Sequence, residues 1–298
     1  ALATAASVVA SQRTPKGERP LNLGLAPKTI FNESITNQRS YSTLSVPLDE
    51  VKSLGKRVGC TVNTIVMSVC SIALERFLTE RDLLPKQALI AMVPVSLRTE
   101  GDISMNNQVS SVRVDLATDI ADIPERFKAI HASSEAAKAV VRELKPVLGI
   151  TLPVTGAPWL MTGLASLFGR SNLAGWLPAV GNVLISNVPG PPMHLYMAGA
   201  RMAHYFPVSI PYHGSGLNIT VHSYAGLLEF GLTACRRVIS QEESWELVKL
   251  LQNALKSIEA LPAVDAAPPA ETAVAVTTPE AAATPAKTVE SGAARKRN

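Results

Sequence analysis

Two stretches in the second half of the chain decide its fold: Asn182-Val-Leu-Ile-Ser-Asn-Val-Pro-Gly-Pro191 and Leu217-Asn-Ile-Thr-Val-His-Ser-Tyr-Ala-Gly-Leu-Leu-Glu-Phe-Gly231. In the first, an apolar strand over residues 183–185 runs into a Ser-Asn pair and a Val-Pro-Gly-Pro stop. The two prolines lack a backbone N–H and fix φ, and Gly190 permits a positive φ, so we expect a rigid turn. In the second, apolar and polar residues alternate on both sides of an Ala-Gly pair, which predicts an antiparallel hairpin.

The composition is typical of a globular protein with a sizeable core. The chain has 298 residues, of which 47% are hydrophobic and 17% charged, enough for one large domain or two ordinary ones. Because uninterrupted apolar runs stay shorter than about 18 residues, we expect no transmembrane helix. The first ten residues resemble a signal h-region but lack a basic n-region and an initiator Met, which favours a fragment boundary.

The cysteines indicate a reducing compartment. Cys60, Cys70 and Cys235 form no Cys-x-x-Cys pair, and none has a His at metal-ligand spacing. Cys70 falls in an apolar helical run, so we expect a small core residue there. This usage predicts a cytoplasmic protein with neither a disulfide framework nor a structural zinc.

The charge pattern argues against nucleic acid as a partner. The formal net charge is +4 and only 5% of the residues are aromatic, without the basic, aromatic-interleaved patches that nucleic-acid binding uses. Lys52, Lys56 and Arg57 share one predicted helix. They are candidates for contact with a CoA phosphate or an anionic membrane, and a solvated helix face is the alternative.

Periodicity predicts the remaining elements, which mix strands with helices and support an α/β sandwich. Residues 146–178 read as short helices and loops, where Trp159, Phe168 and Trp176 would pack in the core or contact a lipid surface. The expected elements are a strand over 41–46, a helix over 48–58 ended by Gly59, a helix capped by Thr61, a buried strand over 88–95, a half-buried strand over 112–116, a helix opened by Asp122, and a last helix opened by a capping box at Ser240.

Composition also sets the expected boundaries. Residues 1–26 read as a linker remnant, and residues 27–261 as one folded domain. After Pro262 the chain turns to Ala, Pro, Thr, Val and Glu without periodicity. We therefore predict that residues 262–298 form a disordered tail.

Several short motifs resemble the C-terminal half of the bacterial wax ester synthase / diacylglycerol acyltransferase family. They occur in the family's order and approximate spacing, which is more specific than any single motif. Besides the stretch around Gly190, they are Pro27-Lys-Thr-Ile-Phe-Asn32 with Arg39, Thr61-Val-Asn63, Val93-Pro-Val-Ser-Leu-Arg98, Asn107-Gln-Val-Ser110, Asp122-Ile-Pro-Glu-Arg126 and Ala198-Gly-Ala-Arg201.

The resemblance implies a fold and a reaction. The fold would be α/β, one half of the chloramphenicol-acetyltransferase-like fold of CoA-dependent acyltransferases, with a mixed sheet, packed helices and a tunnel between two halves. The complete protein would move a fatty acyl group from acyl-CoA to diacylglycerol or a long-chain alcohol. Acyl-CoA would be a substrate, and neither a cofactor nor a metal would be needed.

No residue of this chain matches the family's catalytic motif, His-His-x-x-x-Asp-Gly, which belongs to the N-terminal half. None of its five histidines is adjacent to another or followed by Asp-Gly at the right spacing. The chain also has no Gly-x-Ser-x-Gly elbow, Walker-type loop or carboxylate cluster. We therefore predict no catalytic residue here, and a missing N-terminal catalytic half as a partner.

The candidate site residues are supporting ones. Asn63 matches the first residue of the family's Asn-Asp pair, but Thr64 replaces the Asp and offers only a neutral hydroxyl. Ser186, Asn187 and Gly190 belong to the predicted turn, where the two polar side chains would aim donors into the tunnel or satisfy turn backbone. Tunnel lining and a solvent-facing strand side are equal alternatives for a final set: Asn218, Thr220 and His222.

Two functional interpretations follow. The chain is either the C-terminal part of an O-acyltransferase or a non-catalytic half-domain that binds lipid or a partner. For the O-acyltransferase, a membrane or lipid-droplet surface is a candidate location. A His-His-x-x-x-Asp-Gly motif upstream would favour the first.

Overall fold

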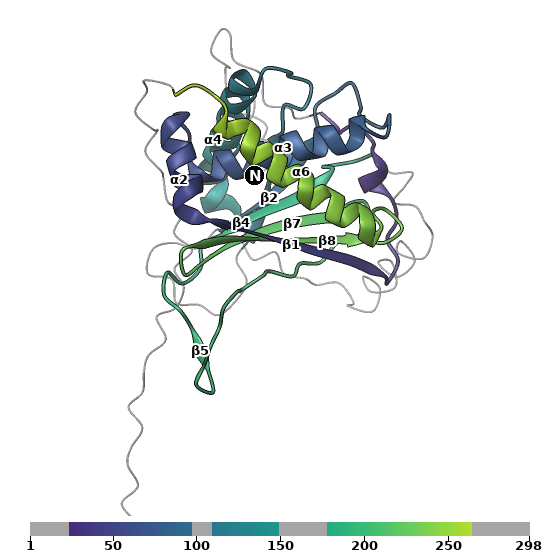
Figure 1. Cartoon of the computed structure of the whole chain (residues 1–298). Helices are drawn as coiled ribbons and strands as arrows, with labels where there is room; N and C mark the ends of the chain where they lie inside the picture. The colour runs from purple at the N-terminus through teal and green to yellow at the C-terminus, as the bar shows by residue number, and fades with distance from the viewer. Residues whose placement is uncertain (1–23, 97–108, 149–177, 264–298) are drawn as a thin grey trace, which may run out of the picture.

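The structure, a computed structural model, describes residues 24–96, 109–148 and 178–263. They form a six-stranded sheet of order β1-β8-β7-β4-β2-β3 and a separate two-stranded pair, β5 and β6 (Figure 1). The strands are β1 (Arg39–Pro47), β2 (Ile90–Ser96), β3 (Val109–Asp115), β4 (Val183–Val188), β5 (Tyr196–Met197), β6 (Ala200–Arg201), β7 (Leu217–Tyr224) and β8 (Leu227–Cys235). The helices are the 3₁₀ turn η1 (Ile30–Asn32), α2 (Leu48–Arg57), α3 (Val62–Thr79), α4 (Ile123–Leu148) and α6 (Gln241–Glu259).

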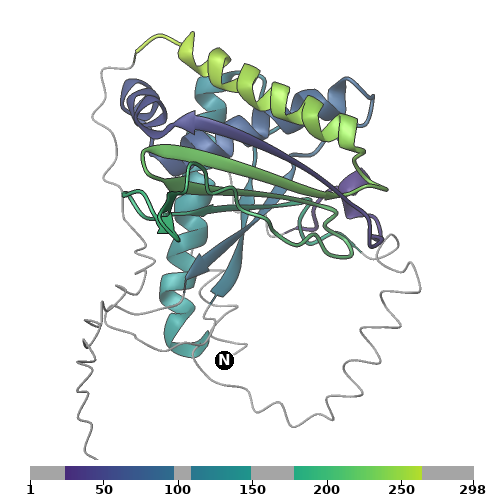
Figure 2. The same cartoon turned by 60° about the horizontal axis from the view of Figure 1, so that its bottom comes forward.

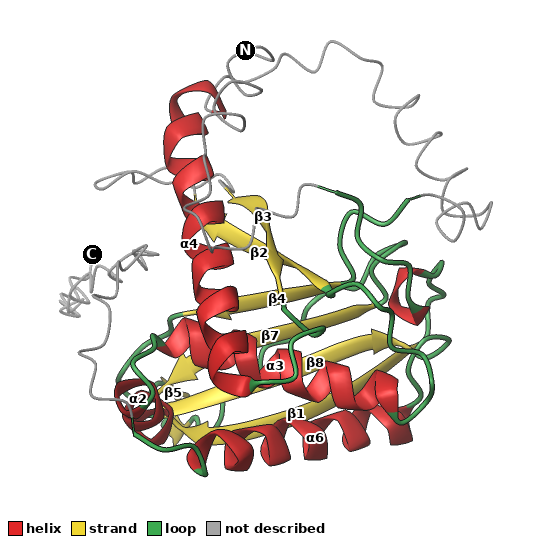
Figure 3. Ribbon diagram, turned by 90° about the horizontal axis from the view of Figure 1, so that it is seen from above, coloured by secondary structure: helices red, strands yellow, loops and turns green. Residues whose placement is uncertain are grey.

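The described helices cover one face of the sheet (Figure 3). The connection that carries β5 and β6 leaves from the opposite face (Figures 1 and 2). β7 pairs parallel with β4, and β4 pairs parallel with β2, whereas the other neighbours in the sheet are antiparallel. The expected α/β architecture, a mixed sheet with packed helices, is confirmed.

The two stretches that opened the sequence analysis form the middle of this sheet. β4 covers the predicted strand, and β7 and β8 form the predicted hairpin, with Ala225 and Gly226 at φ of 46° and 85° in its turn. Leu217, Ile219 and Val221 point into the core, where each is at most 1% exposed. Alternation therefore places the polar residues between them on the face away from the helices.

Local signals also set the helix ends. Gly59 adopts a φ of 69° just after α2, a conformation that glycine reaches without strain. The Thr61 hydroxyl accepts a hydrogen bond from the backbone N–H of Thr64 at 3.1 Å and so caps α3. The predicted capping box at Ser240 is present at the start of α6.

Helix α3 belongs to the protein core. Its length and composition alone would suit a membrane span, but 72% of it is buried within the protein, as expected of a central core helix. Cys70, in this helix, is fully buried, and burial raises the pKa of its thiol to about 12. The prediction that Cys70 is a small core residue is confirmed.

Strand β2 differs from the expectation of a buried strand over 88–95. The chain is buried from Ala88 to Ala91, but Met92 and the residues after it are only half-buried. The reason is the register, because β4 pairs with β2 at Ala91 and Met92 alone. Beyond that point β3 is the one neighbour of β2 among the described strands, so an apolar run that suggested burial on both faces is partly uncovered there.

Several expectations lie outside the described residues. Of the predicted short helices and loops over 146–178, residues 149–177 with Trp159, Phe168 and Trp176 lie outside, whereas 146–148 belong to α4. Most of the predicted linker before residue 27 and the predicted tail after residue 263 also lie outside. Arg98 and Asn107 of the resembling motifs also lie outside. The domain boundaries of the sequence analysis stay predictions.

A buried amide joins the start of β4 to the segment that leads into the domain. Asn182 is 0% exposed. Its Oδ1 accepts the N–H of Ile90 at 2.9 Å, and its Nδ2 donates to the carbonyl of Pro27 at 2.6 Å and to Oδ1 of Asn32 at 2.9 Å. One side chain thus fastens β2, β4 and the lead-in segment together.

Replacing this amide should destabilise the fold. Asn182→Ala removes the acceptor of the Ile90 N–H and a donor to the Pro27 carbonyl, and we expect a loss of about 2 kcal/mol or more in the free energy of unfolding. Thermal or denaturant unfolding measures it. Asn253→Ala is the matched control, because that asparagine is exposed on α6, and its change should stay within about 0.5 kcal/mol. Equal stabilities of the two variants would contradict the role given to Asn182.

Candidate functional site

The turn after β4 is shaped by close packing. Gly190 is not among the described glycines with positive φ, so the reason expected from sequence is wrong. A Cβ at this position would lie 2.2 Å from the carbonyl oxygen of Ser223 and 2.3 Å from Cε1 of His222. The Gly190 N–H also donates to Oγ of Ser223 at 2.9 Å. Glycine is therefore required because the turn lies directly against the end of β7.

Ser186 and Asn187 belong to opposite faces of the sheet. Ser186 is in register with Thr220, whereas Asn187 is in register with Val221. Since Val221 is a core residue beneath the helices, alternation places Asn187 on the helix side and Ser186 on the other side. Both are half-buried. The expectation that both aim into one tunnel therefore fails on geometry, and at most one of them can face a given ligand.

Asn218 and Thr220 are covered by the connection between β4 and β7. We call this connection, residues 189–216, the arm. The Thr220 hydroxyl lies 2.6 Å from that of Ser209 and donates to Oδ1 of Asn218 at 2.9 Å. Nδ2 of Asn218 donates to the carbonyl of Ile210 at 3.5 Å. Both strand residues are buried, so the solvent-facing alternative is wrong, and their polar groups hold the arm.

His222 lies further along the same face and is only half-buried. Its Nδ1 is enclosed and has no hydrogen-bond partner among the described residues. The ring of Tyr205, from the arm, meets the imidazole edge-on at a centroid distance of 4.6 Å. Burial lowers the pKa of His222, and the charge of Glu229 opposes this shift. The surroundings therefore favour a neutral imidazole.

Glu229 has the surroundings of a functional residue, although no sequence motif pointed to it. It faces His222 across the β7–β8 ladder and is 0% exposed. Its Oε1 lies 2.7 Å from Nδ1 of His204 and accepts from the Ser45 hydroxyl at 3.3 Å, and its Oε2 accepts the N–H of Tyr205. A buried carboxylate needs such donors. The only available signal was one acidic residue within an otherwise uncharged strand.

Thr64 contacts the helical layer. Its hydroxyl lies 3.2 Å from Nδ1 of His131 in α4 and 3.0 Å from the hydroxyl of Thr61. The neutral hydroxyl thus links the cap of α3 to α4 at the position where the resemblance implies an Asp. Asn63 is half-buried in the first turn of α3. It lies on the helical side, as Asn187 does, whereas Asn218 and His222 lie on the other side of the sheet.

The other histidines and the basic helix contribute little to a site. His194 is exposed, and Nδ1 of His213 accepts the N–H of Ile35 at 3.3 Å. In α2, Lys52 pairs with Asp49 at 3.6 Å, and Arg57 donates to the carbonyl of Ile258 at 3.1 Å. Arg57 thus satisfies the end of α6, while the basic face remains solvated.

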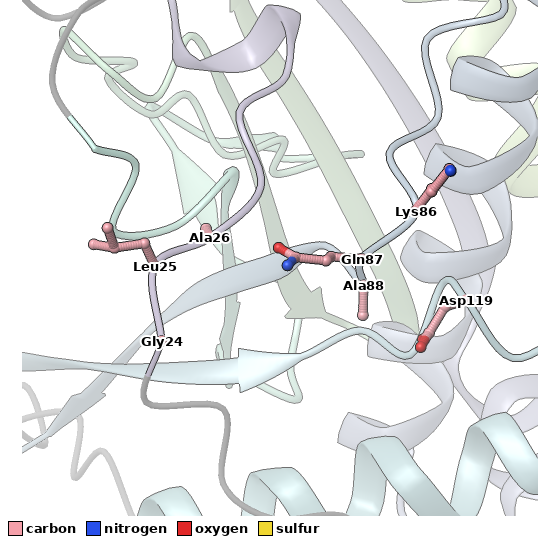
Figure 4. Close-up of a pocket in the computed structure, with 7 residues that line it drawn as sticks. All are labelled: Gly24, Leu25, Ala26, Lys86, Gln87, Ala88 and Asp119. Carbon is pink, nitrogen blue, oxygen red and sulfur yellow. The ribbon is translucent and has the colours of Figure 1, made fainter.

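One pocket of about 550 Å³ opens near the start of β2 (Figure 4). None of the candidate residues lines it. Within residues 24–96, 109–148 and 178–263 no group of three His, Cys, Asp or Glu side chains is placed to hold a metal. The pocket is lined by Gly24, Leu25, Ala26, Lys86, Gln87, Ala88 and Asp119.

Solved structures place this architecture among acyltransferase-type folds. A structure titled for condensation domain-mediated chain release from the enacyloxin polyketide synthase aligns with a TM-score of 0.51 over 80% of this chain and 46% of that chain. Its identity of 15% shows similarity of fold alone. The wax ester synthase/diacylglycerol acyltransferase from Marinobacter aquaeolei VT8 aligns with a TM-score of 0.59 at 30% identity, over 78% of this chain and 52% of that chain. This chain thus covers about half of each of these two solved chains.

Family models give a more specific assignment. The model of the wax ester synthase/diacylglycerol acyltransferase C-terminal domain matches residues 105–259, and that of the family's catalytic domain matches residues 1–66. The chain belongs to this family. Two Mycobacterium tuberculosis proteins that carry diacylglycerol O-acyltransferase names are each 37% identical over 78% of the chain. The chain spans about half the length of these relatives, 51% and 50%.

The lowered pKa of His222 predicts a pH-dependent stability. A histidine whose folded pKa lies below its unfolded value of about 6.5 binds fewer protons when folded. Its stabilising contribution is therefore complete above that value and is lost as the pH falls below it. His222→Phe keeps the ring contact and removes the titration, so its thermal midpoint should fall less between roughly pH 7.5 and 5.5 than that of the parent protein. Identical pH dependences would show that His222 titrates normally.

Proposed function

We propose that this chain is the C-terminal half of an O-acyltransferase that moves a fatty acyl group from acyl-CoA to diacylglycerol or a long-chain alcohol. The observation that carries the proposal is the C-terminal family match over residues 105–259, which spans most of the sheet, α4 and α6. The names of the relatives support the same activity.

The reaction needs groups that this half does not supply by itself. The acceptor hydroxyl attacks the thioester carbonyl, a base takes the hydroxyl proton, and the CoA thiol leaves after the C–S bond breaks. By resemblance, the base belongs to the His-His-x-x-x-Asp-Gly motif of the N-terminal half. His222 has a free Nδ1, but this nitrogen is enclosed against Gly190 and Tyr205. We therefore assign it no base role.

Asn187 is the side chain of this half best placed to support the reaction. It stands at the end of β4, immediately before the turn that is packed against β7. A rigid turn holds an amide donor in one position, and such a donor can stabilise the oxyanion of the tetrahedral intermediate. In this proposal, Ser186 satisfies polar groups on the arm side, and acyl-CoA is a substrate with no further cofactor.

We also propose a cytoplasmic location. The three cysteines are free, and this supports a reducing compartment. Contact with a membrane or a lipid inclusion stays a prediction, because the side chains expected to make it, Trp159, Phe168 and Trp176, lie outside the described residues.

The first test compares two proteins. A complete polypeptide, extended upstream to the length of the relatives, should transfer labelled palmitoyl from palmitoyl-CoA to hexadecanol or diacylglycerol. The present chain alone should show no turnover, because it lacks the base. Comparable turnover by the chain alone would overturn this division of roles. A complete polypeptide that binds palmitoyl-CoA without transferring it would favour the alternative of a non-catalytic lipid-binding protein.

A second test addresses Asn187. If its amide steadies the oxyanion, Asn187→Ala in the complete polypeptide should lower kcat by about 10²- to 10³-fold. The thermal midpoint should hardly move, because the side chain is only half-buried. If the residue merely supports the turn, stability should fall by about 1 kcal/mol, with activity per folded molecule preserved. Kinetics and thermal unfolding of the same variant separate the two roles.

A further inference from the structure

Strand β1 is the outer strand on one side of the described sheet, with β8 as its neighbour. In an antiparallel pair, the backbone groups of every second residue point away from the neighbouring strand. Tyr41 is such a residue, because its N–H donates to Oε1 of Gln241 at 3.1 Å and its carbonyl accepts from Nε2 of the same side chain at 2.8 Å. By alternation, the backbone N–H and C=O of Thr43 and Ser45 also point outward.

The amide of Gln241 takes the place of a peptide group of a further strand. It binds both the N–H and the C=O of one outward residue, as a paired residue does in an antiparallel ladder. The next two outward residues have no such substitute. Among the described residues, the backbone groups of Thr43 and Ser45 have no hydrogen-bond partner outside the β1–β8 ladder. The open edge ends at Pro47, which has no N–H.

An exposed indole lies beside this open edge. Helix α6 runs alongside β1 on the helical face of the sheet (Figure 3). The hydroxyls of Ser42 and Ser244 lie 2.6 Å apart, so the helix follows β1 in the same direction. Trp245 comes four residues after Gln241 on the same side of α6, which places it close to the level of Thr43, and it is 47% exposed. Backbone groups at a sheet edge and an aromatic anchor beside them are the requirements for binding an extended segment.

The chain leaves α6 next to the end of β1. Helix α2 begins directly after β1, and a hydrogen bond between the side chains of Glu259 and Glu50 raises the pKa of Glu50 in the first turn of α2. Arg57, in the same helix, donates to the carbonyl of Ile258 at 3.1 Å. The sequence that continues from residue 263 therefore starts near Pro47, at one end of the open edge.

The sequence beyond α6 contains a segment typical of a strand. Thr272-Ala-Val-Ala-Val-Thr-Thr278 is uncharged, has five β-branched residues and is followed by Pro279, a residue that ends strands. In an extended conformation, Val274 and Val276 share one face. The eight residues before the segment, 264–271, span up to about 26 Å when extended, which is enough for the chain to turn back along β1.

The topology of the sheet fits an added strand. A strand outside β1 and antiparallel to it would run parallel to β8, and α6 would join the two on the helical face. β1 and β2 are also parallel, and α2 and α3 connect them on the same face. Relative to that crossover, both the strand direction and the sideways step are reversed, so the hand is unchanged. One hand for both crossovers agrees with the right-handed rule that nearly all proteins follow.

We propose that residues 272–278 of this chain bind along the outer edge of β1 as an additional strand of the sheet, antiparallel to β1. The segment pairs with the backbone groups of Thr43 and Ser45, and its two valines pack beneath Trp245. Its tether gives it an effective concentration of about millimolar, and its binding closes the edge to strands of other chains. The inference is independent of acyl transfer, because it involves neither Asn187 nor a substrate.

Amide hydrogen exchange tests the pairing directly. The N–H groups of Thr43 and Ser45 should exchange about tenfold or more slowly in the intact chain than in a shortened chain that ends at residue 263, because a hydrogen bond to an added strand must open before exchange. The N–H of Leu44 points towards β8 in both proteins and is the internal control. Equal exchange of Thr43 and Ser45 in the two proteins, as expected of a tail that stays disordered, would overturn the proposal.

A peptide added in trans separates docking from an indirect effect of shortening the chain. A synthetic peptide of residues 270–280, at about millimolar concentration, should restore slow exchange of Thr43 and Ser45 in the shortened chain. The same peptide with Val276→Asp should not, since it brings a charge into the apolar contact with Trp245. Restoration by both peptides, or by neither, contradicts the proposed strand.

Substitutions in the intact chain test the side-chain contact. Val276→Asp and Trp245→Ala should each speed the exchange of Thr43 about tenfold, because they weaken the anchor that holds the segment. Ala283→Asp adds the same charge outside the segment, and Leu83→Ala removes a side chain of a 43% exposed residue just after α3. Both controls should leave the exchange of Thr43 slow. Equal exchange in all four variants would contradict the contact.

Two further results would assign the edge to a different occupant. Slow exchange in the shortened chain that increases with its concentration would show pairing with a second copy. Slow exchange that appears only in the complete polypeptide, with its N-terminal half, would assign the edge to that half. Either result overturns the proposal.

Discussion

The parallel pairing of β4 with β7 is the constraint on which the rest of the structure depends. Neighbouring parallel strands cannot be joined by a tight turn, and the connection is usually a crossover that contains a helix. Here the connection is the arm, residues 189–216, which contains only the short strands β5 and β6. It covers the face opposite the helices, beginning at Gly190, where only a glycine fits against the end of β7.

The polar residues on that face follow from the course of the arm. Asn218 and Thr220 would be unsatisfied in an apolar layer, and Glu229 would be a buried charge without compensation. The arm supplies their partners: the Ile210 carbonyl, the Ser209 hydroxyl, and His204 with the N–H of Tyr205. The polar groups of the sheet and of the arm are thus complementary, and a substitution in one leaves polar groups of the other without hydrogen-bond partners.

Local sequence signals predicted the local structure well, because they depend on neighbours in the chain. The Thr61 cap, the Ala225-Gly226 turn and the alternation in β7 all follow from residues within a few positions. Features set by distant pairing were missed. The end of β2 is half-buried because only Ala91 and Met92 pair with β4. Ser186 and Asn187 lie on opposite faces because of their register with β7. The partners of Glu229 come from the arm, whose path no periodicity describes.

The arm also limits which groups a ligand can reach. The amide of Asn218 and the hydroxyl of Thr220 lie behind it and are engaged with it, so neither group is available on its outer side. These two residues support the arm. The groups of this half that remain for the proposed substrate are Asn187, on the helix side of β4, and those on the outer surface of the arm. An apolar acyl chain and an apolar partner surface both require a contact surface with almost no charge. The arm meets this requirement, because it has one charged residue, Arg201, in its whole length.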